Sequence, residues 1–130
     1  MDIFVGFLEF RKPIFAAING PAFGGGVTQA TLCDGAISAE QAKFSLPFVS
    51  WSVSPEGCSS VHTVRVAGRE TARRLLVHAW TPQASAAKAI GLVSRVVEAG
   101  ALLADQAIRK LVGSKRFRSF GTITSHPEIF

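Results

Sequence analysis

The stretch "KPIFAAINGPAFGGG", residues 12–26, joins an uninterrupted apolar run to three consecutive glycines. The run covers residues 14–18 and is bounded by Pro13 and by a turn at residues 19–20, which predicts a parallel strand covered on both faces. Residues 27–33 follow and are apolar enough to form a buried helix. The stretch therefore predicts a strand, a tight turn and a helix, the basic unit of an α/β fold.

The glycine triplet has two explanations. Glycines cost backbone entropy, so a functional explanation is that the backbone passes close to a ligand and directs free N–H groups at it from a helix start. Such groups stabilise a developing negative charge. The structural explanation is a tight turn packed against a neighbour, and the residues alone leave both open.

The rest of the chain continues this alternation of short elements, without an internal repeat or a linker. We expect helices at residues 1–10, 55–66, 69–78, 82–89 and 102–112, strands at 36–39 and 92–97, and an extended piece at 42–46. Pro55 and Glu56 are expected in the first turn of their helix, and Thr81 as an N-cap followed by proline. We expect one domain over residues 1–112 and a poorly patterned tail over residues 113–130.

Composition narrows the class of protein. Of 130 residues, 48% are hydrophobic and 18% charged, which is typical of a globular chain. The net charge of +5 suits an anionic partner, but the basic residues lack interleaved aromatics, so we expect no nucleic acid. Apolar runs are too short to cross a bilayer. The two cysteines, Cys33 and Cys58, lack metal-ligand spacing, so we expect reduced thiols and no metal site.

A single carboxylate stands in "SPEGCSS", residues 54–60, shortly after an apolar run. Apolar neighbours would raise the pKa of Glu56 and make it a stronger base, whereas an adjacent helix start would lower that pKa. The alternative is a carboxylate that complements the dipole of the following helix.

These stretches, together with "LCDGAISAEQAKFSLPF" and "AKAIGLVSRVV", resemble the enoyl-CoA hydratase/isomerase family, also called the crotonase superfamily. "NGPA" and "SPEGCSS" most resemble the peroxisomal Δ3,Δ2-enoyl-CoA isomerases and chromodomain Y-like domains. The resemblance covers about residues 1–112 and implies a spiral of ββα units. Because family members are about twice as long, it also implies that the N-terminal half of the fold is missing.

The resemblance implies that two backbone N–H groups hold the oxygen of an acyl-CoA thioester and stabilise an enolate. Gly25 corresponds to one donor, and Gly24 and Gly26 shape its turn; the other donor belongs to the missing segment. The two glutamates that activate water in the hydratases correspond to Thr28 and Phe48, which cannot ionise.

In the isomerases a single glutamate moves the proton, and Glu56 falls at its place. The resemblance therefore implies Glu56 and Gly25 as catalytic residues. The candidate substrate-binding residues are Ala22, Gly24, Gly26, Thr28, Phe48 and Trp51.

The implied function is an isomerase of fatty acid β-oxidation that moves the double bond of a 3-enoyl-CoA to the 2-position, without a cofactor. The alternative is a non-catalytic acyl-CoA-binding or protein-interaction fragment of the same fold. The resemblance also implies a trimer-type homo-oligomer and a peroxisomal location. The C-terminal "PEIF" is not a peroxisomal address, so a mitochondrial location stays open.

Overall fold

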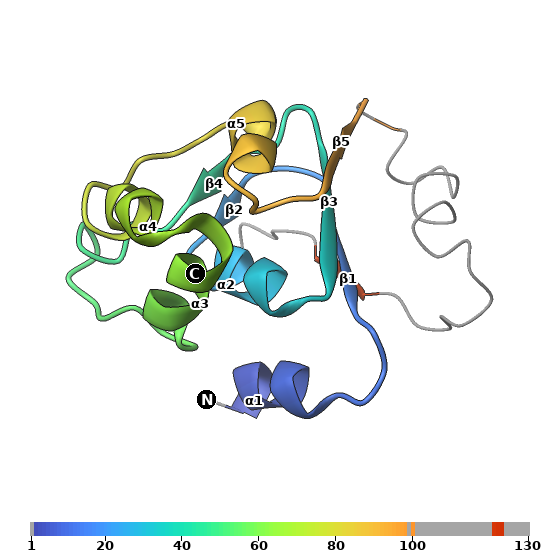
Figure 1. The fold of residues 1–130 in the computed structure, drawn as a ribbon, viewed down its shortest axis with the longest axis horizontal. Coiled ribbons are helices and arrows are strands. Elements are labelled where there is room, and N and C mark those ends of the chain that lie inside the picture. Colours follow the sequence, from blue (N-terminus) through green and yellow to red (C-terminus); the bar gives the residue numbers. More distant parts are fainter. Residues whose placement is uncertain (1, 99, 101–120, 124–130) are drawn as a thin grey trace.

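The computed structural model describes residues 2–98, 100 and 121–123 of the chain. Short helices lie along one side of a small parallel sheet (Figure 1). The helices are α1 (Asp2–Glu9), α2 (Gly25–Leu32), α3 (Ser59–Ala67), α4 (Arg69–Leu76) and α5 (Ala84–Ala89). The strands are β1 (Phe15–Ile18), β2 (Ala22–Phe23), β3 (Gly35–Ala39), β4 (Phe44–Ser45), β5 (Arg95–Val97) and β6 (Gly121–Ile123).

The main sheet has the strand order β5-β3-β1-β6, and every neighbouring pair is parallel. Strand β1 lies inside it, with Ala16 opposite Ala36 of β3. Ala16, Ala17 and Ile18 are all buried, as an interior strand without polar alternation requires. The prediction of a buried parallel strand before the glycines is confirmed.

Two very short strands, β2 and β4, pair in parallel beside the glycine turn. The backbone N–H of Ala22 donates to Lys43 O at 2.7 Å, and that of Gly24 donates to Ser45 O at 2.8 Å. The pair fixes the backbone up to the residue before α2. The sequence predicted the extended piece that contains β4 but not β2, which lies within the turn.

The C-terminal end of α2 is tied to the beginning of β1 through Asp34. Its backbone N–H donates to Ile14 O at 2.8 Å, and its Oδ2 accepts a hydrogen bond from the Ile14 N–H at 2.8 Å. Two reciprocal bonds thus link residues that are 20 positions apart. They hold helix and strand in register around the glycine turn.

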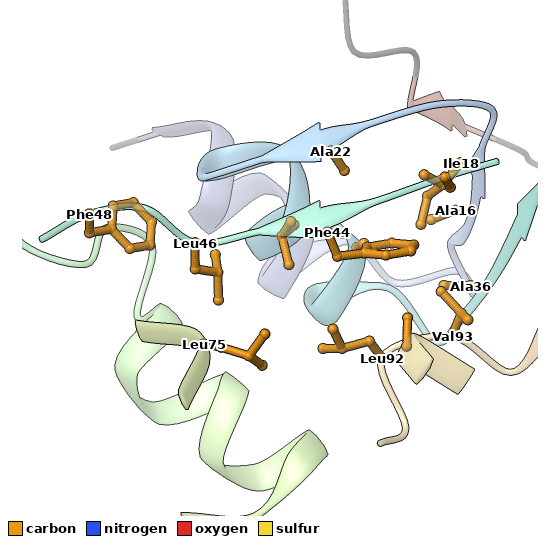
Figure 2. Packing of buried hydrophobic residues seen from close by; sticks show 14 residues of the cluster. Ala16, Ile18, Ala22, Ala36, Phe44, Leu46, Phe48, Leu75, Leu92 and Val93 are labelled. Atoms are coloured by element: carbon orange, nitrogen blue, oxygen red, sulfur yellow. The ribbon is translucent and has the colours of Figure 1, made fainter. Parts of the chain in front are cut away.

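Among the described residues, a hydrophobic cluster joins the two strand layers to the helices (Figure 2). Phe44 and Leu46 contribute its large side chains from the β4 region, Leu75 from α4, and Leu92 and Val93 from the segment before β5. All are at most 5% exposed. Because α4 and the chain around β4 share this cluster, the backbone that leads to residues 47–58 is anchored on the core.

Several helix boundaries differ from the prediction. Helix α3 begins at Ser59, so the placement of Pro55 and Glu56 in its first turn is wrong. Gly57 and Cys58 have φ values of 59° and 58°, and a residue in this left-handed region cannot continue a right-handed helix backwards. Glu56 therefore lies in a loop.

The predicted N-cap at Thr81 is also wrong. Helix α5 begins at Ala84 with Gln83 as its N-cap, and the Thr81 hydroxyl donates to Ser45 Oγ at 3.1 Å. The carbonyl of Pro82 accepts a hydrogen bond from Phe44 N–H at 3.0 Å, so this segment lies beside β4 instead of starting a helix.

At the C-terminal side, β5 is shorter than the predicted strand at 92–97. Strand β6, which the sequence did not predict, pairs with β1. The predicted helix at 102–112 lies outside the described residues. Within the described part of the chain, no helix is long and apolar enough to span a membrane.

Candidate active site

The first backbone N–H groups of α2 follow the glycine turn and make no hydrogen bonds within the helix. Gly24 has φ 51°, a value that favours glycine, and α2 begins at the next residue. The N–H of Thr28 donates to Gly24 O at 3.1 Å, the first bond of the helical ladder. The N–H groups of Gly25, Gly26 and Val27 precede that bond, so they have no acceptor within the helix. This is the geometry of an anion site.

The carboxylate of Glu56 lies over this helix start. Its Oε1 is 3.4 Å from the position that a β-carbon on Gly25 would occupy. A carboxylate oxygen from the loop therefore lies beside the first residue of α2. Gly25 and Glu56 are 31 positions apart along the sequence, so it is the fold that brings them together.

The loop conformation explains how Glu56 reaches this place. The Ser59 N–H donates to the Glu56 carbonyl at 3.0 Å, and the left-handed residues Gly57 and Cys58 turn the chain between them. Helix α3 then packs against α2. Glu56 is outside α3, so the reading of its carboxylate as part of the first turn of that helix is wrong.

Phe48 and Trp51 lie beside Gly24. A β-carbon on Gly24 would lie 2.8 Å from Trp51 Cζ3 and 3.8 Å from Phe48 Cε1. The two rings meet edge to face, with centroids 6.5 Å apart. Phe48 is 1% exposed and belongs to the core, whereas Trp51 is 45% exposed. Of the two, Trp51 is the ring that a bound molecule can reach.

Thr28 and Ala22 support the turn from within. The Thr28 hydroxyl donates to Gly24 O at 3.2 Å, and the side chain is 1% exposed. The Ala22 side chain lies 3.9 Å from the position of a β-carbon on Gly26. Thr28 thus uses its hydroxyl on the turn itself, and Gly26 has room for a methyl group.

The surroundings of Glu56 are more exposed to solvent than the sequence indicated. Its side chain is exposed, and Val49 and Val53 are 60% and 52% exposed. Those apolar neighbours therefore do not remove the carboxylate from water. Among the described residues, no hydrogen bond or ion pair to this carboxylate is present, which leaves its oxygens available to a ligand.

Sequence reasoning missed one residue beside the site, Phe4 of α1. A β-carbon on Gly25 would lie 3.8 Å from Phe4 Cζ, and one on Gly57 would lie 2.6 Å from Phe4 Cδ1. The apolar spacing at residues 3, 4, 7 and 8 is typical of one helical face, on which Phe4 and Phe7 are half-buried while Ile3 and Leu8 are exposed. It did not indicate what that face contacts.

The two cysteines, Cys33 and Cys58, are free thiols in different surroundings. Burial, with a smaller effect of the Asp34 charge, raises the pKa of the Cys33 thiol to about 11. Its Sγ donates to Gln29 O at 3.3 Å, so it is a packed, protonated thiol, whereas Cys58 is exposed. In residues 2–98, 100 and 121–123, no group of three or more His, Cys, Asp or Glu side chains could hold a metal ion.

Comparisons with known proteins agree on one family. The sequence model of the Enoyl-CoA hydratase/isomerase family matches residues 2–117. The chain is 36% identical over 103 residues to Testis-specific chromodomain protein Y 1 of Homo sapiens, covering 79% of this chain and 19% of that protein. It is 38% identical over 103 residues to Crotonyl-CoA hydratase of Syntrophomonas wolfei, covering 79% of this chain and 39% of that protein.

Solved structures that are similar to this chain belong to the same family. An enoyl-CoA hydratase/isomerase from Pseudoalteromonas atlantica T6c superposes with a TM-score of 0.79 at 33% identity, over 85% of this chain and 45% of that chain. An enoyl-CoA hydratase from Mycobacterium smegmatis gives a TM-score of 0.74 at 35% identity, over 79% and 46%. The chain thus has an α/β, crotonase-like fold and spans less than half the length of these relatives.

Proposed function

Because the chain belongs to the enoyl-CoA hydratase/isomerase family, we propose that it acts on an acyl-CoA thioester as a Δ3,Δ2-enoyl-CoA isomerase, with Glu56 as the proton carrier and Gly25 N–H as an oxyanion donor. The observation that carries the proposal is the 3.4 Å between Glu56 Oε1 and the β-carbon position of Gly25. This distance supports a binding mode in which the carbonyl oxygen of the substrate accepts from the Gly25 amide and the neighbouring carbons lie near that carboxylate.

The reaction uses one base in two steps. The Glu56 carboxylate removes a proton from C2 of a 3-enoyl-CoA, and the electron pair of that C–H bond spreads over the thioester carbonyl and the C3–C4 double bond. The Gly25 amide donates to the resulting dienolate oxygen. Glu56, now a carboxylic acid, returns the proton to C4, which leaves the double bond between C2 and C3.

Hydration is the competing reaction within the family, and a relative is named Crotonyl-CoA hydratase. A hydratase must activate water with carboxylates, and the two positions that correspond to them by resemblance hold other residues. Thr28 has its hydroxyl committed to Gly24 O, and Phe48 is an apolar core residue. Neither can remove a proton from water, so the site supports isomerisation better.

A second candidate is an acyl-CoA-binding or protein-interaction module without catalysis. Two observations favour it: the exposed position of Glu56, and the 36% identity to chromodomain proteins. A base works best where water is excluded, and the described residues leave this carboxylate in contact with solvent. Both candidates share acyl-CoA recognition at the start of α2 and differ in turnover.

Two substrates tested side by side separate isomerase, hydratase and binder. The proposal predicts that a 3-enoyl-CoA gains the ultraviolet absorbance of a conjugated thioester, and that a 2-enoyl-CoA keeps it. Loss of absorbance from the 2-enoyl-CoA would identify a hydratase. Binding of both without any spectral change would identify the non-catalytic module.

Location and assembly belong to the same proposal. A β-oxidation isomerase would work in peroxisomes or mitochondria, and as a homo-oligomer of the trimer type. A fluorescent fusion of the full gene product, imaged with markers of both organelles, tests the first, and light scattering of the purified protein tests the second.

A further inference from the structure

The ring of Phe4 lies between the two backbone segments that form the candidate site. A β-carbon on Gly57 would lie 2.6 Å from Phe4 Cδ1 and 2.7 Å from Cγ and Cε1, and one on Gly25 would lie 3.8 Å from Cζ. The ring therefore spans from the loop that carries Glu56 to the first residue of α2. Helix α1, which supplies it, packs against α2 (Figure 1).

Two observations favour glycine at position 57. Its φ is 59°, and a side chain there would overlap the aromatic ring of Phe4. With glycine the ring lies directly on the backbone next to Glu56. Phe4 is half-buried, so part of the ring remains uncovered on the molecule.

Under the proposed function, an acyl group would lie close to the β-carbon position of Gly25. The β-carbon position of Gly25 is 3.4 Å from Glu56 Oε1 and 3.8 Å from Phe4 Cζ. A thioester bound at the Gly25 amide, with C2 and C4 beside the carboxylate, must therefore extend alongside the ring or push it away. An aromatic ring at that distance is an apolar boundary for an acyl chain.

We propose that Phe4 is a specificity-determining residue that limits the length of the acyl chain accepted at the Gly25–Glu56 site. The inference rests on the proposed function for the acyl-CoA ligand, and it adds the substrate class: short acyl groups. An acyl chain that extends beyond the ring has to displace Phe4 from Gly57, and this displacement removes the contact between α1 and the loop.

The test is calorimetric binding of butanoyl-CoA and decanoyl-CoA to the full chain and to Phe4→Ala. These saturated thioesters do not react, so the readout is independent of catalysis. Removal of the ring should raise the affinity for decanoyl-CoA relative to butanoyl-CoA roughly tenfold, the size of effect that a few methylene groups produce in an apolar pocket. Phe10→Ala is the matched control, because it removes the same ring from a position that is 48% exposed.

A second variant, Phe4→Leu, keeps an apolar side chain on α1 and should shift the ratio in the same direction by a smaller factor. The ratio of the two affinities does not depend on the fraction of folded protein, so partial unfolding of a variant leaves the test valid. An unchanged ratio in variants that still bind acyl-CoA overturns the inference and leaves the proposed function intact. Absence of binding by the unaltered chain to either thioester overturns the proposed function, and the inference with it.

Discussion

The indole of Trp51 lies so close to Gly24 that a β-carbon at position 24 would be 2.8 Å from Trp51 Cζ3. Gly24 also has φ 51°. The first glycine of the triplet is thus required twice, by its backbone conformation and by a neighbouring ring. Gly25 and Gly26 have neither requirement. Alanine substitutions at the three glycines therefore separate effects on stability from effects on activity.

Gly24→Ala should destabilise the fold by about 1–3 kcal/mol, since a left-handed conformation is strained for alanine and the Trp51 ring has to move. Urea unfolding followed by tryptophan fluorescence measures this. Gly68→Ala is the matched control, because Gly68 has φ 82° but nothing within 4 Å of its β-carbon position. Equal losses in the two variants would show that the ring contact contributes nothing.

Gly25→Ala should fold normally and lose function. Its new methyl group would lie 3.4 Å from Glu56 Oε1 and 3.8 Å from Phe4 Cζ, which are ordinary contacts, but it would fill the space proposed for the substrate. We expect a loss in kcat/KM on the order of 10²-fold, measured with a 3-enoyl-CoA. Full activity in this variant would place the substrate elsewhere.

Gly26→Ala is the counterpart within the helix. Its β-carbon would meet Ala22 at 3.9 Å, and a helical glycine replaced by alanine typically gains about 0.5–1 kcal/mol. We expect a higher urea midpoint with activity retained. A destabilised Gly26→Ala protein would mean that α2 does not begin as described.

Asp34→Ala removes the carboxylate that accepts the Ile14 N–H at 2.8 Å. The bond lies at an exposed position, so the expected cost in the free energy of unfolding is about 1 kcal/mol. Glu40→Ala, also at an exposed position, serves as the control for loss of an acidic side chain. Chemical unfolding of both should show the loss for Asp34→Ala alone.

Cys33 gives stability a defined pH dependence. Burial raises its pKa to about 11, above the ordinary value of 9.0, so the unfolded chain releases this proton first as the pH rises. The unfolded state then binds fewer protons than the native state, and stability falls between about pH 9 and pH 11. In Cys33→Ala the decline should be shallower across that window, as urea midpoints at pH 8 and pH 10 would show. Parallel declines in the two proteins would contradict this cause.

Local patterns predicted the centre of the fold correctly. A short apolar run between proline and a turn favours a covered strand because it is too short for a typical helix, and β1 is such a strand. The resemblance in "NGPAFGGG" and "SPEGCSS" implies roles for Gly25 and Glu56, and the structure has Glu56 Oε1 3.4 Å from the β-carbon position of Gly25; their catalytic roles stay predictions.

The errors arose where distant residues determine the conformation. Helix α3 begins late because Cys58, an ordinary L-residue, has a left-handed conformation that no sequence rule assigns to it. Strand β2 forms because Ala22 pairs with Phe44 of β4 and its N–H donates to Lys43 O. The sequence did not predict that Phe4 lies beside the site, because its contact with Gly57 joins residues that are 53 positions apart.

The central claim is that the Glu56 carboxylate carries the proton, and Glu56→Gln tests it most directly because the amide keeps the shape and loses the basicity. The measurement is the initial rate of conversion of a 3-enoyl-CoA to its conjugated isomer, with acyl-CoA affinity measured in parallel. We predict a rate roughly 10²- to 10⁴-fold lower with affinity retained. Equal rates for the two proteins would contradict the claim.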